Sequence, residues 1–183
     1  MGDASDVEGV EEIARLFAID GRYLGCGEIE TGLINSTWLV SYEREGGGCE
    51  EYILQRINEG VFGDPLDVMR NVASVTRHIN RKVLRVKRDA GGQTLSLYPG
   101  RDGRSFVMGP GGGIWRCYNY IEGCRTYDVV ENRRQAFQAG RAFGAFLDLV
   151  DDLPADEIVE VIPEFHDTRK RFEQLKEAVA VDE

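Results

Sequence analysis

Apolar residues follow two different spacings along this chain, and the change between them predicts its elements. From Val7 to Ile19 they recur every three or four residues, which predicts a helix that ends at Asp20–Gly21. Residues 23–30, 37–42 and 51–57 are instead runs rich in β-branched and aromatic side chains, separated by glycine-containing stretches. We expect these runs to form three strands of an antiparallel meander.

The helical spacing returns after these strands. Asp64 and Pro65 are typical of a helix start, because Asp can accept a backbone N–H at the N-cap and Pro fits the first helical position. An apolar stripe runs from Leu66 to Val83, and we expect the helix to end near Arg81–Lys82.

Three more strands, and then helices alone, are predicted in the rest of the chain. The strands are expected at residues 93–98, 104–108 and 114–121, and the helices at residues 131–150 and from Asp167 onwards. Strands first and helices after them indicate an α+β fold. The helix at 131–150 has a broad apolar face that must be covered by the last helix, covered by another chain or left exposed. We expect a homo-oligomer formed through this face.

Composition narrows the classes of function. The chain has 183 residues, of which 42% are hydrophobic, and a formal net charge of -10, so we expect about one compact domain and no nucleic-acid partner. The basic run at residues 77–88 is interpreted as a solvated helix end and strand start rather than a polyanion site. No apolar stretch approaches a membrane span or a signal peptide, so we expect a cytoplasmic protein with no membrane partner. Four cysteines without a C-x-x-C pair give little support for a zinc site.

The order of the first elements has a parallel in kinases. A strand, a glycine-containing turn, two further strands and a long helix begin a protein-kinase-like N-terminal lobe. In that lobe a loop covers the ATP phosphates, the third strand offers a side chain to them, and the helix braces that side chain. The last strand leads into a hinge whose backbone pairs with adenine.

Six motifs carry a family resemblance, and in chain order they are Gly32–Val40, Tyr52–Asn58, Val61–Pro65, Trp115–Gly123, Ala139–Gly144 and Ile162–Phe172. The sequence resembles the family that includes aminoglycoside phosphotransferases and choline kinases, and within it the N-acetylhexosamine 1-kinase-like branch. The likeness extends from about Gly21 to Phe172. It implies an N-terminal helix at 1–20, a nucleotide-binding lobe and hinge at 21–123, and the helical start of an incomplete C-terminal lobe at 124–183.

The resemblance assigns a phosphate-covering loop to the first glycine-containing turn. Gly32, Asn35, Ser36 and Thr37 would lie over the phosphates of ATP, the implied cofactor, where backbone N–H groups and hydroxyls suit phosphate oxygens. The same residues are also typical of an ordinary hairpin turn, in which Ser and Thr satisfy the backbone.

The third strand and the hinge complete the implied nucleotide site. Gln55 stands where many kinases place a phosphate-gripping lysine, and it can donate hydrogen bonds but cannot neutralise charge. Arg56 is adjacent, but strand alternation should point it the other way. The hinge would be Tyr118–Gly123, with Tyr120 and Glu122 beside the nucleotide.

The chemistry of the family is missing from this sequence. The family's H-G-D-x-x-x-x-N run and later Asp are both absent, so we assign no catalytic and no metal-binding residue. Asp167, beside His166, is interpreted as a helix N-cap. Mg²⁺ and a sugar acceptor are expected only with a complete C-terminal lobe.

Three functional hypotheses follow from these observations. The first is the nucleotide-binding lobe of a truncated sugar-kinase-like phosphotransferase, inactive alone. The second is a non-catalytic interaction module that reuses the lobe. The third is one half of a split kinase, completed by a separately encoded lobe.

Overall fold

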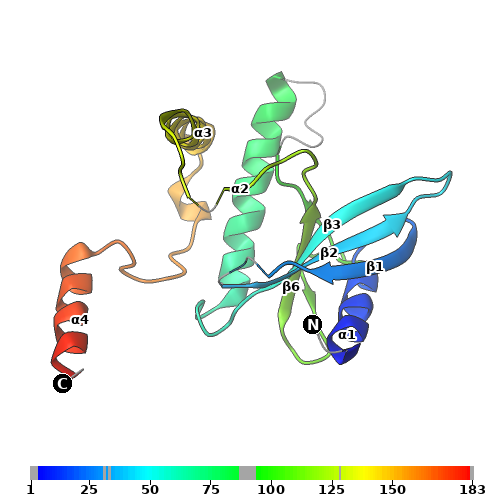
Figure 1. The fold of residues 1–183 in the computed structure, drawn as a ribbon, viewed down its shortest axis with the longest axis horizontal. Coiled ribbons are helices and arrows are strands. Elements are labelled where there is room, and N and C mark those ends of the chain that lie inside the picture. The colour runs from blue at the N-terminus through cyan, green and yellow to red at the C-terminus, as the bar shows by residue number, and fades with distance from the viewer. Residues whose placement is uncertain (1–3, 31, 33, 87–93, 128, 182–183) are drawn as a thin grey trace.

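The computed structural model describes residues 4–30, 32, 34–86, 94–127 and 129–181, and it confirms the α+β class. Six strands form one antiparallel sheet in the order β1-β2-β3-β6-β4, and β5 also pairs with β6 (Figure 1). The elements are α1 (Ala4–Arg15), β1 (Arg22–Glu28), β2 (Ser36–Glu43), β3 (Cys49–Arg56), α2 (Pro65–Val86), β4 (Leu97–Tyr98), β5 (Val107–Met108), β6 (Ile114–Asn119), α3 (Arg133–Val150), a 3-10 turn η1 (Ala155–Glu157) and α4 (Thr168–Val181).

The predicted meander is confirmed. Strands β1, β2 and β3 pair as antiparallel neighbours, with Val40 opposite Tyr52 in the centre of the β2–β3 pair. Gly46, Gly47 and Gly48 join β2 to β3 with φ values of 100°, 89° and 102°. That left-handed conformation is available to glycine at little cost, so this triplet produces the tight reversal.

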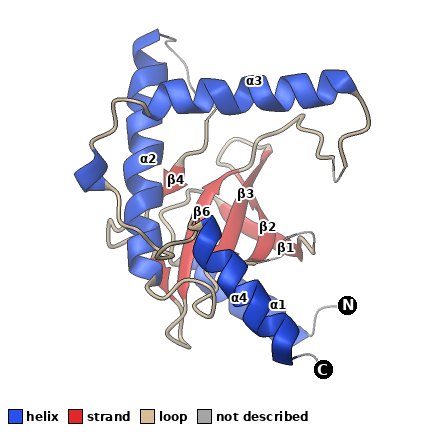
Figure 2. Cartoon of the chain, turned by 90° about the vertical axis from the view of Figure 1, so that its left-hand side faces the viewer, coloured by secondary structure: helices blue, strands red, loops and turns tan. Residues whose placement is uncertain are grey.

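Alternation along the strands divides the sheet into two faces. Val40, Leu54 and Cys117 lie fully buried on the face that α1 covers, in one core with Ile13 and Phe17. Residues of the opposite parity, such as Ile57 and Ile114, form a second core with Val68 and Met69 of α2. Figure 2 shows α2 running alongside the sheet. The two helices therefore cover different faces.

Helix α2 begins as the sequence predicted. The Asp64 carboxylate accepts a hydrogen bond from Leu66 N at 2.8 Å, with Pro65 in the first helical position. The helix continues to Val86, about one turn beyond the expected end at Arg81–Lys82, because residues 81–85 contain no glycine or proline to stop it.

Two short strands and the first helix also differ from the prediction at their ends. Strands β4 and β5 have only two residues each, because both pair with the same edge of β6, β4 opposite residues 117–118 and β5 opposite residues 114–115. Helix α1 ends at Arg15 instead of continuing to Ile19, since Phe17 pairs with Gly100 and Ala18 N donates to the Pro99 carbonyl at 2.9 Å.

Helix α3 and the segment after it attach to α2 through polar side chains. Asn71 donates to the Val159 carbonyl at 2.7 Å and accepts from Val159 N at 2.8 Å, and Ser74 donates to Glu157 at 2.5 Å. Further along α2, His78 and Lys82 both contact Asp152. These four α2 residues are three or four positions apart, so they form one polar stripe.

The apolar face of α3 stays exposed in this structure. No described residue of α3 is buried, and Phe137 and Phe143 are 67% and 65% exposed. Of the three outcomes expected for this face, cover by the last helix is therefore not observed, and α4 lies apart from α3 (Figure 1). None of the described helices combines the length and apolar character needed to cross a membrane.

Candidate functional site

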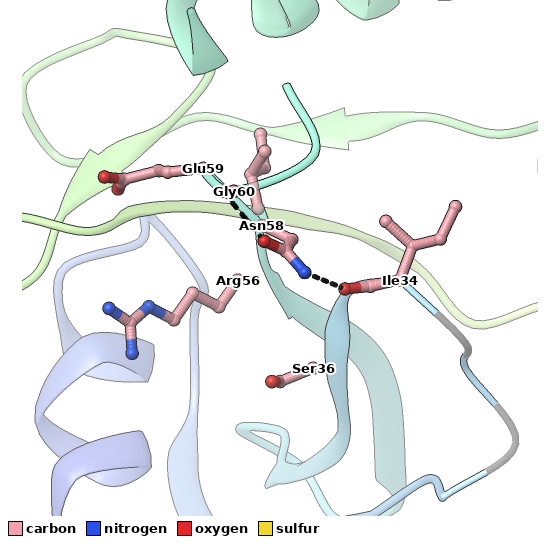
Figure 3. A pocket seen from close by; sticks show the side chains of 7 residues that line it. Ile34, Ser36, Arg56, Asn58, Glu59 and Gly60 are labelled. Atoms are coloured by element: carbon pink, nitrogen blue, oxygen red, sulfur yellow. Dashed lines mark hydrogen bonds between the residues drawn. The ribbon is translucent and has the colours of Figure 1, made fainter. Parts of the chain in front are cut away.

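The turn between β1 and β2 is fastened to the segment that follows β3. Asn58 N donates to the Asn35 side-chain oxygen at 2.9 Å, and the Asn58 amide donates to the Ile34 carbonyl at 2.9 Å. The Asn58 side-chain oxygen accepts a hydrogen bond from Gly60 N, also at 2.9 Å (Figure 3). This pair of asparagines ties the end of the turn, at Ile34 and Asn35, to the segment after β3, so Asn35 acts here as a brace.

A cleft of about 330 Å³ opens beside this brace (Figure 3). Ser36 and Arg56 are opposite one another in the β2–β3 register and both line the cleft, so they share a face of the sheet. The cleft is lined by Ile34, Ser36, Arg56, Ile57, Asn58, Glu59 and Gly60.

On the other face, three strands bring three polar side chains into one row. Thr37, Gln55 and Arg116 are successive register partners across β2, β3 and β6. Arg116 donates from Nε and Nη2 to the Gln55 side-chain oxygen, at 2.9 and 2.5 Å. Gln55 in turn donates from Nε2 to Thr37 Oγ1 at 2.9 Å, and Thr37 donates to the Asn35 carbonyl at 3.3 Å. The row therefore connects β6 to the base of the first turn.

Arg116 is the only charged member of this row. Its side chain is half-buried, and burial holds the pKa of its guanidinium below the usual value. No carboxylate lies within ion-pair distance of it in the described ranges. Burial also raises the pKa of Tyr118, whose ring lies 5.9 Å from the guanidinium, so this phenol is neutral at pH 7. The charge of Arg116 thus has no nearby compensation among these residues.

The predicted hinge, Tyr118–Gly123, lies at the C-terminal end of β6 and in the segment that follows it. Tyr120 N donates to the Glu51 carbonyl at 3.3 Å, which extends the β3–β6 pairing by one step. A cleft of about 450 Å³ adjoins this end, with three acidic side chains in its wall. It is lined by Glu50, Glu51, Ser96, Tyr98, Asn119, Tyr120 and Glu122.

The structure brings together some of the predicted site residues and separates others. Thr37 and Gln55 are in direct contact. Gly32 packs against the backbone of Asn35, and a Cβ added to Gly32 would meet the Asn35 carbonyl oxygen at 3.0 Å. Ser36 faces away from them, beside Arg56. The expected opposite orientation of Gln55 and Arg56 is confirmed.

Sequence reasoning missed Arg116. The available signal was a cation in the middle of the otherwise apolar and aromatic run Ile114–Tyr118, at a position that alternation assigns to the same face as Tyr118. The register that places it against Gln55 cannot be read from the sequence, because the two residues are 61 positions apart.

Helix α4 begins with the cap that the sequence predicted. Asp167 accepts a hydrogen bond from Lys170 N at 3.0 Å, so its interpretation as an N-cap of α4 is confirmed.

In the part of the chain that the structure describes, no three His, Cys, Asp or Glu side chains gather in a way that could hold a metal ion. No known protein-family model matches the sequence.

Proposed function

We propose that this chain is the nucleotide-binding lobe of a small-molecule kinase-like phosphotransferase. The observation that carries the proposal is the row formed by Thr37, Gln55 and Arg116 below the β1–β2 turn. In a kinase lobe, the third strand presents its phosphate-contacting side chain to the same region, under the loop that covers the phosphates. Gln55 is on that third strand.

The charges along β6 suit a ligand with one neutral end and one anionic end. Arg116 is four residues from Tyr120, or about 13 Å at the rise of ~3.3 Å per strand residue. The end near Tyr120 has Glu51 and Glu122 beside it, which repel phosphate, while the charge of Glu50 is paired with Arg44. A nucleotide would therefore place its base near Tyr120 and its phosphates near Arg116.

The described residues supply binding groups but no set of groups for phosphoryl transfer. Thr37 and Gln55 offer polar atoms, whereas the backbone N–H of Tyr120 is already donated to the Glu51 carbonyl, so a base at this end would pair with other groups. A carboxylate that accepts the proton of an acceptor hydroxyl, with carboxylate or amide ligands for Mg²⁺, would have to come from elsewhere. We therefore propose nucleotide binding without turnover by this chain, and a sugar as acceptor only in a complete enzyme.

Isothermal titration calorimetry of the full chain with ATP, with and without Mg²⁺, tests this proposal. We expect saturable binding at one site per chain in both conditions. Absence of heat, together with unchanged amide chemical shifts at millimolar ATP, would reject the nucleotide-binding lobe.

The same experiment serves the interaction-module hypothesis. The exposed Phe137, Phe143 and Leu147 of α3 favour that reading, because a module of this kind needs an apolar contact surface. If ATP does not bind, this alternative becomes the leading one.

A further inference from the structure

We propose that Arg116 supplies the positive charge for the phosphates of the bound nucleotide, which Gln55 of the third strand cannot supply. The inference rests on the proposed function, and it names a phosphate-binding residue on β6 rather than on β3. Its chemical target is the polyphosphate group of a nucleoside triphosphate.

Arg116 has N–H donors that its hydrogen bonds to Gln55 leave unused. A guanidinium has five N–H groups in a planar fork. Two of them, on Nε and Nη2, donate to the Gln55 side-chain oxygen. For the other three, the residues that the structure describes offer no acceptor within hydrogen-bond distance. These three donors match the two-oxygen geometry of a phosphate, which guanidinium groups bind through parallel hydrogen bonds.

The direct neighbours of Arg116 do not balance its positive charge. A partly buried cation without a counter-charge is unfavourable, because it has lost water and gained no anion in return. The direct neighbours of Arg116 on its face are Gln55, which is neutral, and the neutral phenol of Tyr118. An anion placed against the free edge of the guanidinium would remove this penalty. The glutamine therefore orients the arginine and leaves its full charge for a ligand.

Hydrogen bonds connect Arg116 to the first turn. The row Arg116–Gln55–Thr37 ends at the Asn35 carbonyl, at the base of the β1–β2 turn. A phosphate at Arg116 would therefore lie on the same face of the sheet as the base of that turn, two strands away from β2. Arg56, in contrast, lies in the cleft on the opposite face, although it is adjacent to Gln55 in sequence.

Equilibrium titrations of the full chain with ATP, adenosine and inorganic tripolyphosphate test the inference. The test variant is Arg116→Gln, and the matched control is Arg56→Gln, which removes an arginine from the other face. Loss of a charge-assisted contact worth about 1.5–3 kcal/mol predicts a roughly 10- to 150-fold weaker affinity for ATP. We expect adenosine affinity to be unchanged in Arg116→Gln, and all three affinities to be unchanged in Arg56→Gln.

The outcomes separate this inference from the proposed function. If Arg116→Gln binds ATP as tightly as the unchanged chain, the role of Arg116 is wrong and the nucleotide-binding lobe stands. If the unchanged chain binds tripolyphosphate through Arg116 but binds ATP no better, the anion site stands and the nucleotide function is wrong. If it binds neither, both are wrong.

A second variant keeps the test decisive if Arg116→Gln does not fold. Gln55→Glu has nearly the same shape, and its carboxylate would occupy the charge of Arg116 in an ion pair. We expect ATP affinity to fall at least tenfold while the fold is retained, as measured by circular dichroism. Full ATP affinity in folded Gln55→Glu would also overturn the inference.

Discussion

The substitution Gln55→Glu makes a second, ligand-free prediction about the charge of Arg116. The carboxylate replaces a neutral oxygen that already accepts two N–H groups of Arg116, at 2.9 and 2.5 Å. If the guanidinium is uncompensated in the fold, the new ion pair should stabilise the protein. If it is already paired, a second carboxylate would gain nothing and would lose the bond to Thr37.

The expected size of the effect follows from the contacts. A hydrogen bond to a charged group contributes about 1.5–3 kcal/mol, against about 0.5–1.5 kcal/mol for a neutral one. Desolvation of the half-buried carboxylate and loss of the Gln55–Thr37 bond reduce the gain. We expect the free energy of unfolding to rise by about 1 kcal/mol, which corresponds to a melting temperature about 2–4 °C higher for a chain of this size.

The stabilisation should depend on pH in a defined direction. The ion pair lowers the folded-state pKa of the new carboxyl below its unfolded value of about 4.3. The added stability is therefore present above about pH 4.3 and is lost as the pH falls through the folded-state pKa. Melting curves at pH 7 and pH 3 should differ between the variant and the unchanged chain only at pH 7.

A matched exposed pair serves as the control for this measurement. Arg171 donates to the Gln174 side-chain oxygen at 2.8 Å on the exposed surface of α4. Gln174→Glu creates the same ion pair in solvent, where it should add no more than about 0.5 kcal/mol. The reasoning about Arg116 is refuted if Gln55→Glu destabilises the fold at pH 7 while Gln174→Glu behaves as expected.

Three other predictions concern the helices: two test contacts between α2 and the segment after α3, and the third tests self-association through α3. Asn71→Ala leaves both backbone groups of Val159 without their partner, so the unfolding free energy should fall by about 1–3 kcal/mol in urea titrations, and a smaller loss than 0.5 kcal/mol would contradict it. The pKa of Asp152 is lowered to about 2 by hydrogen bonds from Lys82 and His78, so its contribution to folding stability is present above about pH 3.8 and is lost as the pH falls towards 2. Asp152→Asn should therefore flatten the acid side of the curve of unfolding free energy against pH, and an unchanged curve would argue against the contact. Self-association through α3 should give a concentration-dependent sedimentation coefficient that Phe143→Ser reduces, and a constant monomer value in the unchanged chain would reject it.

Local signals in the sequence were sufficient for most elements. The Asp64–Pro65 pair identified the start of α2, and Asp167 identified the start of α4, because an N-cap is a contact between residues only a few positions apart. The end of α1 was missed, because Phe17 leaves the helix to pair with Gly100. That contact joins segments more than 80 residues apart and leaves no local trace.

The candidate site shows the same division. Alternation alone predicted that Gln55 and Arg56 point to opposite faces, and by the same rule it separates Ser36 from Thr37. Alternation could not predict that the Asn35 side-chain oxygen accepts a hydrogen bond from Asn58 N, or that Arg116 donates to the Gln55 side-chain oxygen. Both depend on which strand or segment lies next to which.

The sequence by itself determined the α+β class, the meander, the starts of α2 and α4 and the direction of each side chain along its strand, because these follow from spacing and from contacts within a few residues. Only the tertiary structure decided that β6 lies against β3 with Arg116 opposite Gln55. Strand order and register are set by packing of both sheet faces against α1 and α2, and that packing is a property of the assembled fold.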